Sequence, residues 1–91
     1  MNGVPACASK KLLSDILRGE WNFTGYVVSD DMAVINEVRT HHFLTTYEEA
    51  AAVSIKAGCN LELSDTGSGY AFQSIPVVCC FKLFIIVLFC V

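Results

Sequence analysis

A short apolar stretch that ends in a serine and two carboxylates constrains this chain more than any other feature. Strand-forming residues at 26–28 follow Gly25 and run directly into Ser29, Asp30 and Asp31, which predicts a strand over residues 26–29. A fully apolar strand is typical of a parallel sheet that is buried on both faces. Because α/β barrels carry catalytic groups at the C-terminal ends of such strands, Asp30 is a candidate catalytic carboxylate. The alternative is that Ser29 or Asp30 only caps the following helix.

Helix and strand signals alternate along the rest of the first 69 residues. Apolar residues at helical spacing predict a helix over residues 10–20, with Ser9 as its cap. A capping box at residues 46–49 begins a second helix, which Gly58 ends. Residues 31–38 form either a short helix or a loop, and residues 59–63 resemble a second strand. This order predicts a parallel α/β architecture. Two strands and two helices are too few to form a closed architecture of this kind.

Length, charge and cysteine content exclude several classes of protein. The 91 residues are far fewer than the roughly 250 of an α/β barrel. Nine acidic and six basic residues give a net charge of −3, which argues against a nucleic-acid-binding surface. The five cysteines include no C-x-x-C pair and make no metal signature. Cys7 and Cys59 could pair if folding brings them together, and otherwise are small buried thiols.

The last 22 residues differ in composition from the rest of the chain. Residues 70–91 are almost entirely apolar and contain one charged residue, Lys82. Residues 75–91 just reach the lower limit of the about 17–25 residues that cross a bilayer, and Lys82 near their middle disfavours a span. A buried strand of this length is equally unusual. We therefore expect a folded part over residues 1–69 and an apolar tail over residues 70–91 that is non-native sequence or membrane-associated.

The first 64 residues contain a series of short motifs in unbroken order, at residues 2–8, 12–13, 16–18, 20–30, 42, 48–52 and 55–62. Together these motifs resemble glycoside hydrolase family 3, and in particular its β-xylosidase-like and β-glucosidase-like branch. The resemblance covers about residues 2–64 and stops before the tail.

The resemblance implies a fold, an activity and one catalytic residue. Members of this family have an N-terminal (β/α)8 TIM-type barrel and a following α/β sandwich domain, and they remove terminal sugars from β-linked glycans with retention of configuration. The Asp of the family's Val-Val-Ser-Asp motif is the nucleophile, which corresponds here to Asp30. The chain would then supply about two βα units of the barrel, with a glycoside or oligosaccharide as substrate and no cofactor. The parent enzyme is expected outside the cell or in the secretory pathway.

Other side chains that carry chemistry have simpler interpretations. The acid/base carboxyl of this family usually comes from the later domain; Glu62 is a candidate replacement, although a solvated or salt-bridged Glu is the simpler interpretation. Asp31 stands where relatives often carry Trp, Cys or Gln. His41 and His42 lie near carboxylates, but the resemblance requires no metal. Trp21 either packs against the fold or stacks on a sugar, and packing is the default.

The sequence therefore predicts part of a retaining exo-β-glycosidase that carries Asp30 and is inactive by itself. Two alternatives stay open: a small membrane-anchored protein that contacts the bilayer through residues 75–91, and a non-catalytic carbohydrate-binding remnant. No nucleic-acid partner, metal or cofactor is expected.

Overall fold

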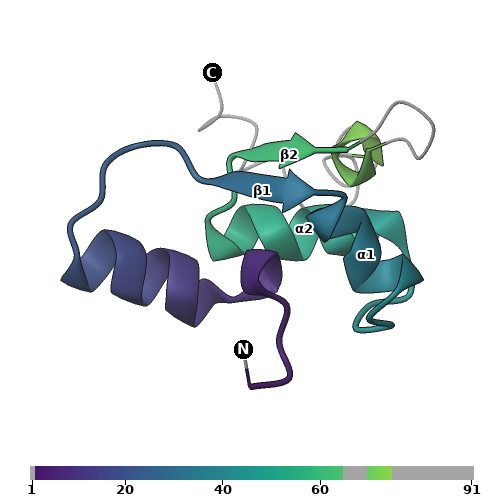
Figure 1. Cartoon of the computed structure of the whole chain (residues 1–91), viewed down its shortest axis with the longest axis horizontal. Coiled ribbons are helices and arrows are strands. Elements are labelled where there is room, and N and C mark those ends of the chain that lie inside the picture. The colour runs from purple at the N-terminus through teal and green to yellow at the C-terminus, as the bar shows by residue number, and fades with distance from the viewer. Residues whose placement is uncertain (1, 65–69, 75–91) are drawn as a thin grey trace.

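The described chain is a small α/β unit (Figure 1). The computed structural model describes residues 2–64 and 70–74, so the predicted turn at 65–69 and the tail from residue 75 onward lie outside the described residues. In chain order the elements are η1 (Ala6–Ala8), η2 (Lys11–Glu20), β1 (Val28–Asp31), α1 (Ala33–Arg39), α2 (Tyr47–Ala57), β2 (Leu61–Leu63) and η3 (Ala71–Ser74). Within these residues, no helix combines the length and apolar character that a membrane crossing requires.

The two strands pair in parallel, and α1 and α2 lie between them in the chain. This is the connection that parallel strands need, and it confirms the predicted parallel architecture. Both strands begin two residues later than the predicted ranges, 26–29 and 59–63. The reason lies in Asn60, whose side-chain oxygen accepts the Val27 N–H at 2.9 Å and the Arg18 guanidinium at 2.9 Å. Side-chain bonds therefore hold the chain just before β1.

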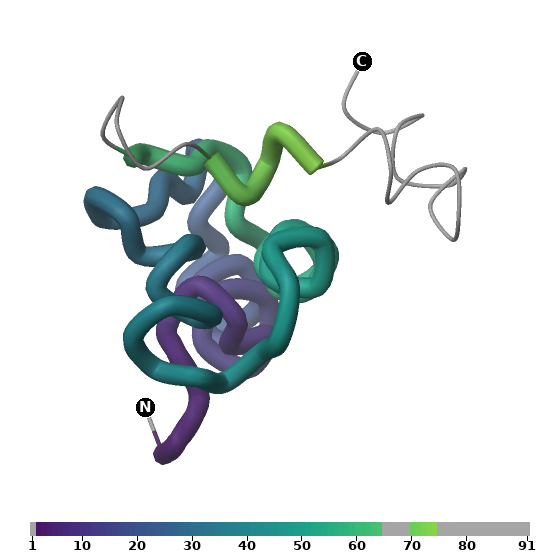
Figure 2. Tube along the Cα trace, turned by 90° about the vertical axis from the view of Figure 1, so that its right-hand side faces the viewer, coloured from purple at the N-terminus to yellow at the C-terminus, as the bar shows by residue number. Residues whose placement is uncertain are grey.

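Both clusters of the core include residues of α2, which contacts η1, η2 and η3. One cluster joins α1, α2 and η3 through Val34, Ile35, Ala50, Ala51 and Ala71. A second cluster joins η2 to the end of α2 and the following turn through Leu13, Ala57 and Cys59. Small side chains dominate both clusters, which lets the elements approach closely. Figure 2 shows η3 beside β2, on the side of the molecule away from the N-terminus.

The helix α2 is built as the capping box predicts. Its N-cap is Thr46, whose hydroxyl oxygen accepts the Glu49 N–H at 3.2 Å. The Glu49 carboxylate reaches back and accepts the Thr45 N–H at 3.1 Å and the Thr45 hydroxyl at 2.7 Å, and these bonds lower the pKa of Glu49. Gly58, with a φ of 122°, ends the helix in a conformation that favours glycine.

The first predicted helix is also present, but it is wound differently. The η2 segment is a π-helix, with the Trp21 N–H donating to the Ile16 carbonyl at 2.9 Å. Ser9 makes the hydrogen bond expected of a cap: its hydroxyl oxygen accepts the Leu12 N–H at 3.2 Å. Nothing in the residue types of this segment explains the wider winding.

Candidate active site at the end of β1

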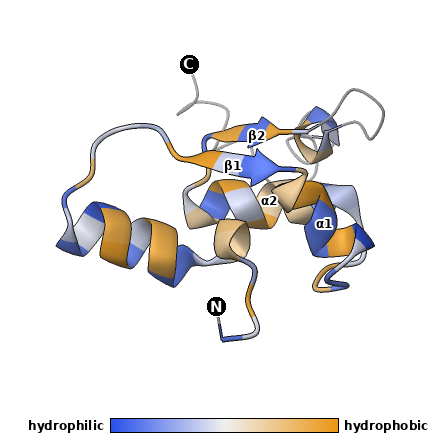
Figure 3. Cartoon of the chain, in the orientation of Figure 1, coloured by the Kyte–Doolittle hydropathy of each residue, from blue (hydrophilic) through white to orange (hydrophobic). Residues whose placement is uncertain are grey.

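The carboxylate of Asp30 lies at the C-terminal end of β1 and is exposed. Figure 3 shows the strand changing from hydrophobic at its start to hydrophilic at its tip. The Asp30 Oδ1 atom accepts the N–H of Asp31 at 2.8 Å, which orients the carboxylate. Neither Ser29 nor Asp30 caps the next helix, because the N-cap of α1 is Met32 and no side chain caps it. The capping alternative for this acidic motif is therefore wrong.

Ser29 gives the end of β1 its shape. Val28 lies opposite Leu61 and Asp31 lies opposite Leu63, so β1 uses one residue more than β2 over the same length. The buried Ser29 hydroxyl accepts the Leu63 N–H at 2.9 Å and donates to the Asp30 carbonyl at 2.9 Å. A side chain thus occupies a place in the strand pairing that a backbone carbonyl normally fills. Bulges of this kind re-aim the side chains next to them, and here that neighbour is Asp30.

The chain leaves β1 through a residue in an unusual conformation. Met32 has a φ of 59°, in the left-handed region that residues with a Cβ rarely adopt. Its N–H donates to the Leu63 carbonyl at 2.8 Å, which closes the strand pair, and its carbonyl accepts the first bond of α1 from Asn36 at 2.9 Å. These two hydrogen bonds of Met32 therefore hold the turn between β1 and α1, directly after Asp30 and Asp31.

A cavity of about 370 Å³ adjoins Asp30. Its walls come from the N-terminal segment, η2, β1, the start of α1 and the loop before α2: Pro5, Ala6, Cys7, Leu13, Val27, Val28, Asp30, Ala33 and His41. Most of this lining is apolar, and its polar side chains are the Asp30 carboxylate, the His41 imidazole and the Cys7 thiol. Apolar walls with a few convergent polar groups are the usual character of small-molecule sites.

Two further acidic residues near the sheet, Glu37 and Glu62, are buried and bind groups away from Asp30. Glu62 accepts the N–H groups of Ala71 at 2.8 Å and Phe72 at 2.7 Å, so it holds the start of η3. Glu37 is fully buried, and its Oε1 atom accepts the Ser54 hydroxyl at 2.9 Å. Burial raises the pKa of Glu37 to about 7. The expectation of a solvated or salt-bridged Glu62 is wrong, and the sequence held no signal for the burial of Glu37.

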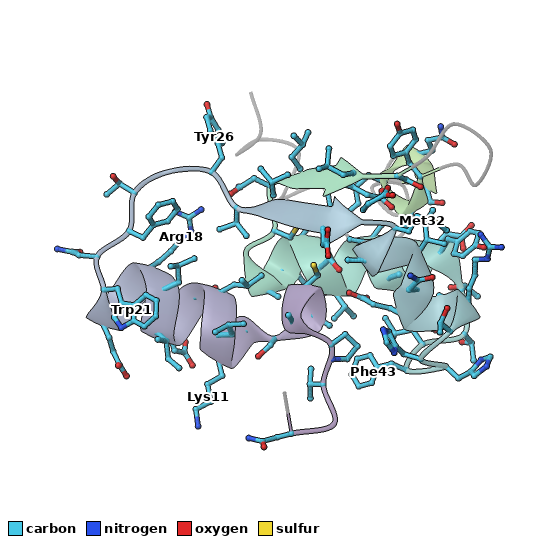
Figure 4. All side chains as sticks on the ribbon, viewed as in Figure 1. Lys11, Arg18, Trp21, Tyr26, Met32 and Phe43 are labelled. Carbon is cyan, nitrogen blue, oxygen red and sulfur yellow. The ribbon has the colours of Figure 1, made fainter. Side chains whose placement is uncertain are left out.

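The remaining predicted residues lie at different places in the fold. Trp21 is 69% exposed, so the expectation that it packs is wrong; in Figure 4 it lies at the far end of the view from Met32. His41 lines the Asp30 cavity, and both His41 and His42 line a neighbouring cavity of about 520 Å³. Asp31 is exposed beside Asp30. Across residues 2–64 and 70–74, no group of three or more His, Cys, Asp and Glu side chains gathers as a metal site would require.

Similarity to known proteins extends over most of the chain. The model of the glycosyl hydrolase family 3 N-terminal domain matches residues 1–79. β-D-xylosidase 1 of Arabidopsis thaliana is 47% identical over 62 residues, which are 68% of this chain and 8% of that protein. The periplasmic β-glucosidase of Salmonella typhimurium is 42% identical over 65 residues, 71% of this chain and 8% of that protein.

A solved structure shares the fold described above. It is that of a β-glucosidase from Erythrobacter marinus, with a TM-score of 0.80 and 35% sequence identity. The match covers 90% of this chain and 10% of that one, so the chain spans about a tenth of the length of the proteins that it resembles. The family match over residues 1–79 shows that the chain belongs to glycosyl hydrolase family 3.

Proposed function

We propose that this chain is part of the barrel of a retaining exo-β-glycosidase, in which Asp30 is the nucleophile. The observation that carries the proposal is the position of the Asp30 carboxylate, exposed at the C-terminal end of a parallel strand and beside an apolar cavity. Catalytic groups of (β/α)8 barrels come from this end of the strands. On this proposal, β1, α1, α2 and β2 belong to about two βα units of the barrel, and η3 packs against α2 through Ala71.

The proposed reaction needs a carboxylate that is accessible and held in place. Asp30 would attack the anomeric carbon of a terminal β-xylosyl or β-glucosyl residue while the glycosidic C–O bond breaks. The leaving oxygen takes a proton from a second carboxyl group, and water then hydrolyses the glycosyl-enzyme ester to release the sugar. The Asp31 N–H holds Asp30 Oδ1 at 2.8 Å, and the Ser29 bonds fix the backbone beneath it.

The second carboxyl group is the part that the described residues do not supply. A retaining enzyme needs its acid/base about 5–5.5 Å from the nucleophile. Glu62 is bound to the N–H groups that begin η3, and Glu37 is fully buried against Ser54. Asp31 is adjacent in sequence, and its N–H already binds the Asp30 carboxylate. We therefore expect the 91-residue chain to hydrolyse no aryl β-xyloside or β-glucoside above the rate in buffer.

A chimera tests the proposed role. Residues 2–64 would replace the matching segment of the Arabidopsis β-D-xylosidase 1, which then supplies the acid/base and the remaining barrel. We expect the chimera to hydrolyse an aryl β-xyloside, and Asp30→Gly to lower the rate by roughly 10⁴-fold or more. Azide should restore turnover of Asp30→Gly and give a glycosyl azide of inverted configuration, since the anion occupies the place of the missing carboxylate. The matched control, Asp31→Asn, should keep its activity within about tenfold.

Two results would contradict the proposal. One is a chimera whose activity survives Asp30→Gly. The other is a chimera that folds, as judged by circular dichroism, but turns over no substrate.

A further inference from the structure

The loop that joins η2 to β1, residues 21–27, contains an acceptor pattern for N-glycosylation. Residues 22–24 read Asn-Phe-Thr, which fits Asn-X-Ser/Thr with a residue other than proline in the middle. We call residues 22–24 the acceptor triplet. It is the only such triplet in the sequence, because valine or glutamate stands two positions after each of the other asparagines, Asn2, Asn36 and Asn60.

The middle residue of the acceptor triplet holds the loop against η2. The Phe23 N–H donates to the Leu17 carbonyl at 3.0 Å, and the Phe23 carbonyl accepts the Arg18 guanidinium at 3.3 Å. Arg18 also donates to the Gly25 carbonyl at 3.0 Å and lies 5.9 Å from the centre of the Phe23 ring. The ring in turn covers Gly25, where an added Cβ would lie 2.6 Å from the Phe23 Cζ atom. These contacts fix the backbone in the middle of the triplet.

The two side chains that the modification uses, Asn22 and Thr24, are exposed. Neither side chain forms a hydrogen bond with any part of the chain that the structure describes. Asn22 has a φ of 58°, in the left-handed region where asparagine is enriched. The amide nitrogen of Asn22 can therefore take a substituent without breaking a contact of the fold.

The acceptor triplet lies away from the candidate nucleophile. It precedes β1, whereas Asp30 lies at the C-terminal end of that strand. In Figure 4, Arg18 and Trp21 lie at the opposite end of the view from Met32. None of residues 21–26 lines the cavity beside Asp30. A glycan on Asn22 would therefore leave this cavity open.

Three aromatic side chains of the same loop are exposed to an unusual degree. Trp21 is 69% exposed, Phe23 is 42% exposed and Tyr26 is 85% exposed. Apolar surface concentrated on one loop favours association with other molecules. A glycan is bulky and hydrophilic, so one attached between Trp21 and Phe23 would shield this surface from such contacts.

We propose that Asn22 is an N-glycosylation site in a chain that passes through a eukaryotic secretory pathway, and that its glycan covers the aromatic side chains of the loop. The observations that carry the proposal are the exposed, unbonded side chains of Asn22 and Thr24 on a loop that Phe23 fixes from within. The proposal does not depend on the role of Asp30.

The reaction transfers an oligosaccharide from a polyprenyl diphosphate lipid to the Asn22 amide nitrogen. A bond forms between this nitrogen and C1 of the first sugar, while the bond between C1 and the diphosphate oxygen breaks. The lipid diphosphate leaves with the bonding electron pair, and the amide proton passes to a base of the transferase. No oxidation or reduction takes place.

The test translates the full chain, behind a cleavable signal peptide, in the presence of endoplasmic-reticulum vesicles. Chains that resist added protease lie inside the vesicles, and only these are scored. We expect one glycan on each modified chain. A peptide N-glycosidase should remove it and leave an aspartate at position 22, which mass spectrometry distinguishes from the asparagine of the sequence.

Substitutions in the acceptor triplet assign the site. Asn22→Gln and Thr24→Ala should each abolish the glycan, whereas Thr24→Ser keeps the hydroxyl and should retain it. Asp30→Asn should be modified like the unsubstituted chain, so failure here and failure of the nucleophile proposal are distinguishable. A glycan that persists in Asn22→Gln would contradict the assignment.

A second acceptor position controls for the activity of the vesicles. Phe43→Asn creates a triplet over residues 43–45, in another loop with exposed residues, and should add a second glycan. Protected chains that carry a glycan at position 43 and none at Asn22 would overturn the proposal.

Covering of the loop has a separate readout. Trp21 is the only tryptophan of the chain, so tryptophan fluorescence reports on this loop alone. We expect acrylamide to quench the glycosylated chain with a lower quenching constant than the same chain after enzymatic removal of the glycan. Asn22→Asp has the sequence of the deglycosylated product and is the matched control, which should be quenched like that product. Equal quenching before and after removal would contradict the covering.

Discussion

The Ser29 hydroxyl accepts the backbone N–H of Leu63 across the two strands at 2.9 Å. A side chain thereby completes the pairing of β1 and β2 at the C-terminal end of β1. The same hydroxyl donates to the carbonyl of Asp30, so one buried group links both strand ends to the candidate nucleophile.

Removing that hydroxyl should weaken the fold. In Ser29→Ala the Leu63 N–H loses its acceptor, which is expected to lower the free energy of unfolding by about 1–3 kcal/mol. Urea denaturation followed by circular dichroism measures the change. Thr24→Ala removes an exposed hydroxyl and should change the stability by less than about 0.5 kcal/mol. Equal effects of the two substitutions would contradict the role given to Ser29.

The left-handed conformation of Met32 gives a second prediction. Its φ of 59° strains a residue with a Cβ but not a glycine. We expect Met32→Gly to be more stable than Met32→Ala by about 1 kcal/mol, because both lose the long side chain and only glycine relieves the strain. This is the reverse of the order in a regular helix or strand. The denaturant midpoints of the two variants give their order of stability. A Met32→Ala variant more stable than Met32→Gly would show that the backbone at this position is not strained.

Burial of Glu37 makes stability depend on pH. The folded-state pKa of about 7 lies above the ordinary value of 4.5, so between these pH values the folded chain holds a proton that the unfolded chain has lost. The contribution of Glu37 to stability should therefore be fully present below about pH 4.5, decrease by roughly 3 kcal/mol as pH rises to 7, and change little above it.

A matched pair of variants isolates the Glu37 contribution. Glu37→Gln has no proton to lose and should flatten this part of the stability curve relative to the unsubstituted chain. Glu48→Gln, at the exposed start of α2, should give a stability curve parallel to that of the unsubstituted chain. Unfolding by urea at pH 4.5, 6 and 7.5 measures both. Curves for Glu37→Gln and the unsubstituted chain that stay parallel across the range would show that Glu37 ionises normally.

The bonds around Asn60 give a prediction about the start of β1. Its Oδ1 atom accepts the Arg18 guanidinium and the Val27 N–H, both at 2.9 Å. Asn60→Asp keeps both acceptor contacts and adds an ion pair, so stability should rise by up to about 1 kcal/mol at low salt and less at high salt. Asn60→Ala should instead cost about 1–2 kcal/mol. Denaturation at two ionic strengths measures both changes. A stability gain in Asn60→Asp that is the same at both ionic strengths would exclude the ion pair.

The sequence predicted those parts of the fold that depend on short-range chemistry. The cap at Thr46, the stop at Gly58 and the parallel α/β order each follow from residues within one turn or one strand of each other. The family was also recognisable from the sequence, because its motifs lie in unbroken order. The position of Asp30 at the end of a strand follows from the apolar run before it, whereas the expected burial of that strand on both faces is wrong, because Val28 is 46% exposed.

Features that depend on long-range contacts could not be predicted. Both strands begin later than predicted because the Asn60 side chain accepts the Val27 N–H, and Val27 is 33 positions away in the sequence. Glu62 is buried because η3, later in the chain, brings two N–H groups to it. No residue near Glu62 in the sequence predicts this contact.

Trapping of the glycosyl-enzyme is the most direct test of the central claim that Asp30 is the nucleophile. The reagent is a 2-deoxy-2-fluoro-β-xyloside with a dinitrophenolate leaving group, which departs without a proton and so needs no acid catalyst. Fluorine at C2 destabilises the oxocarbenium-like transition states, and the covalent intermediate accumulates. Applied to the chimera that carries residues 2–64, followed by digestion and mass spectrometry, it should label the peptide at Asp30. A label on Asp31 or on any other carboxylate, in a chimera that turns over substrate, would contradict the assignment.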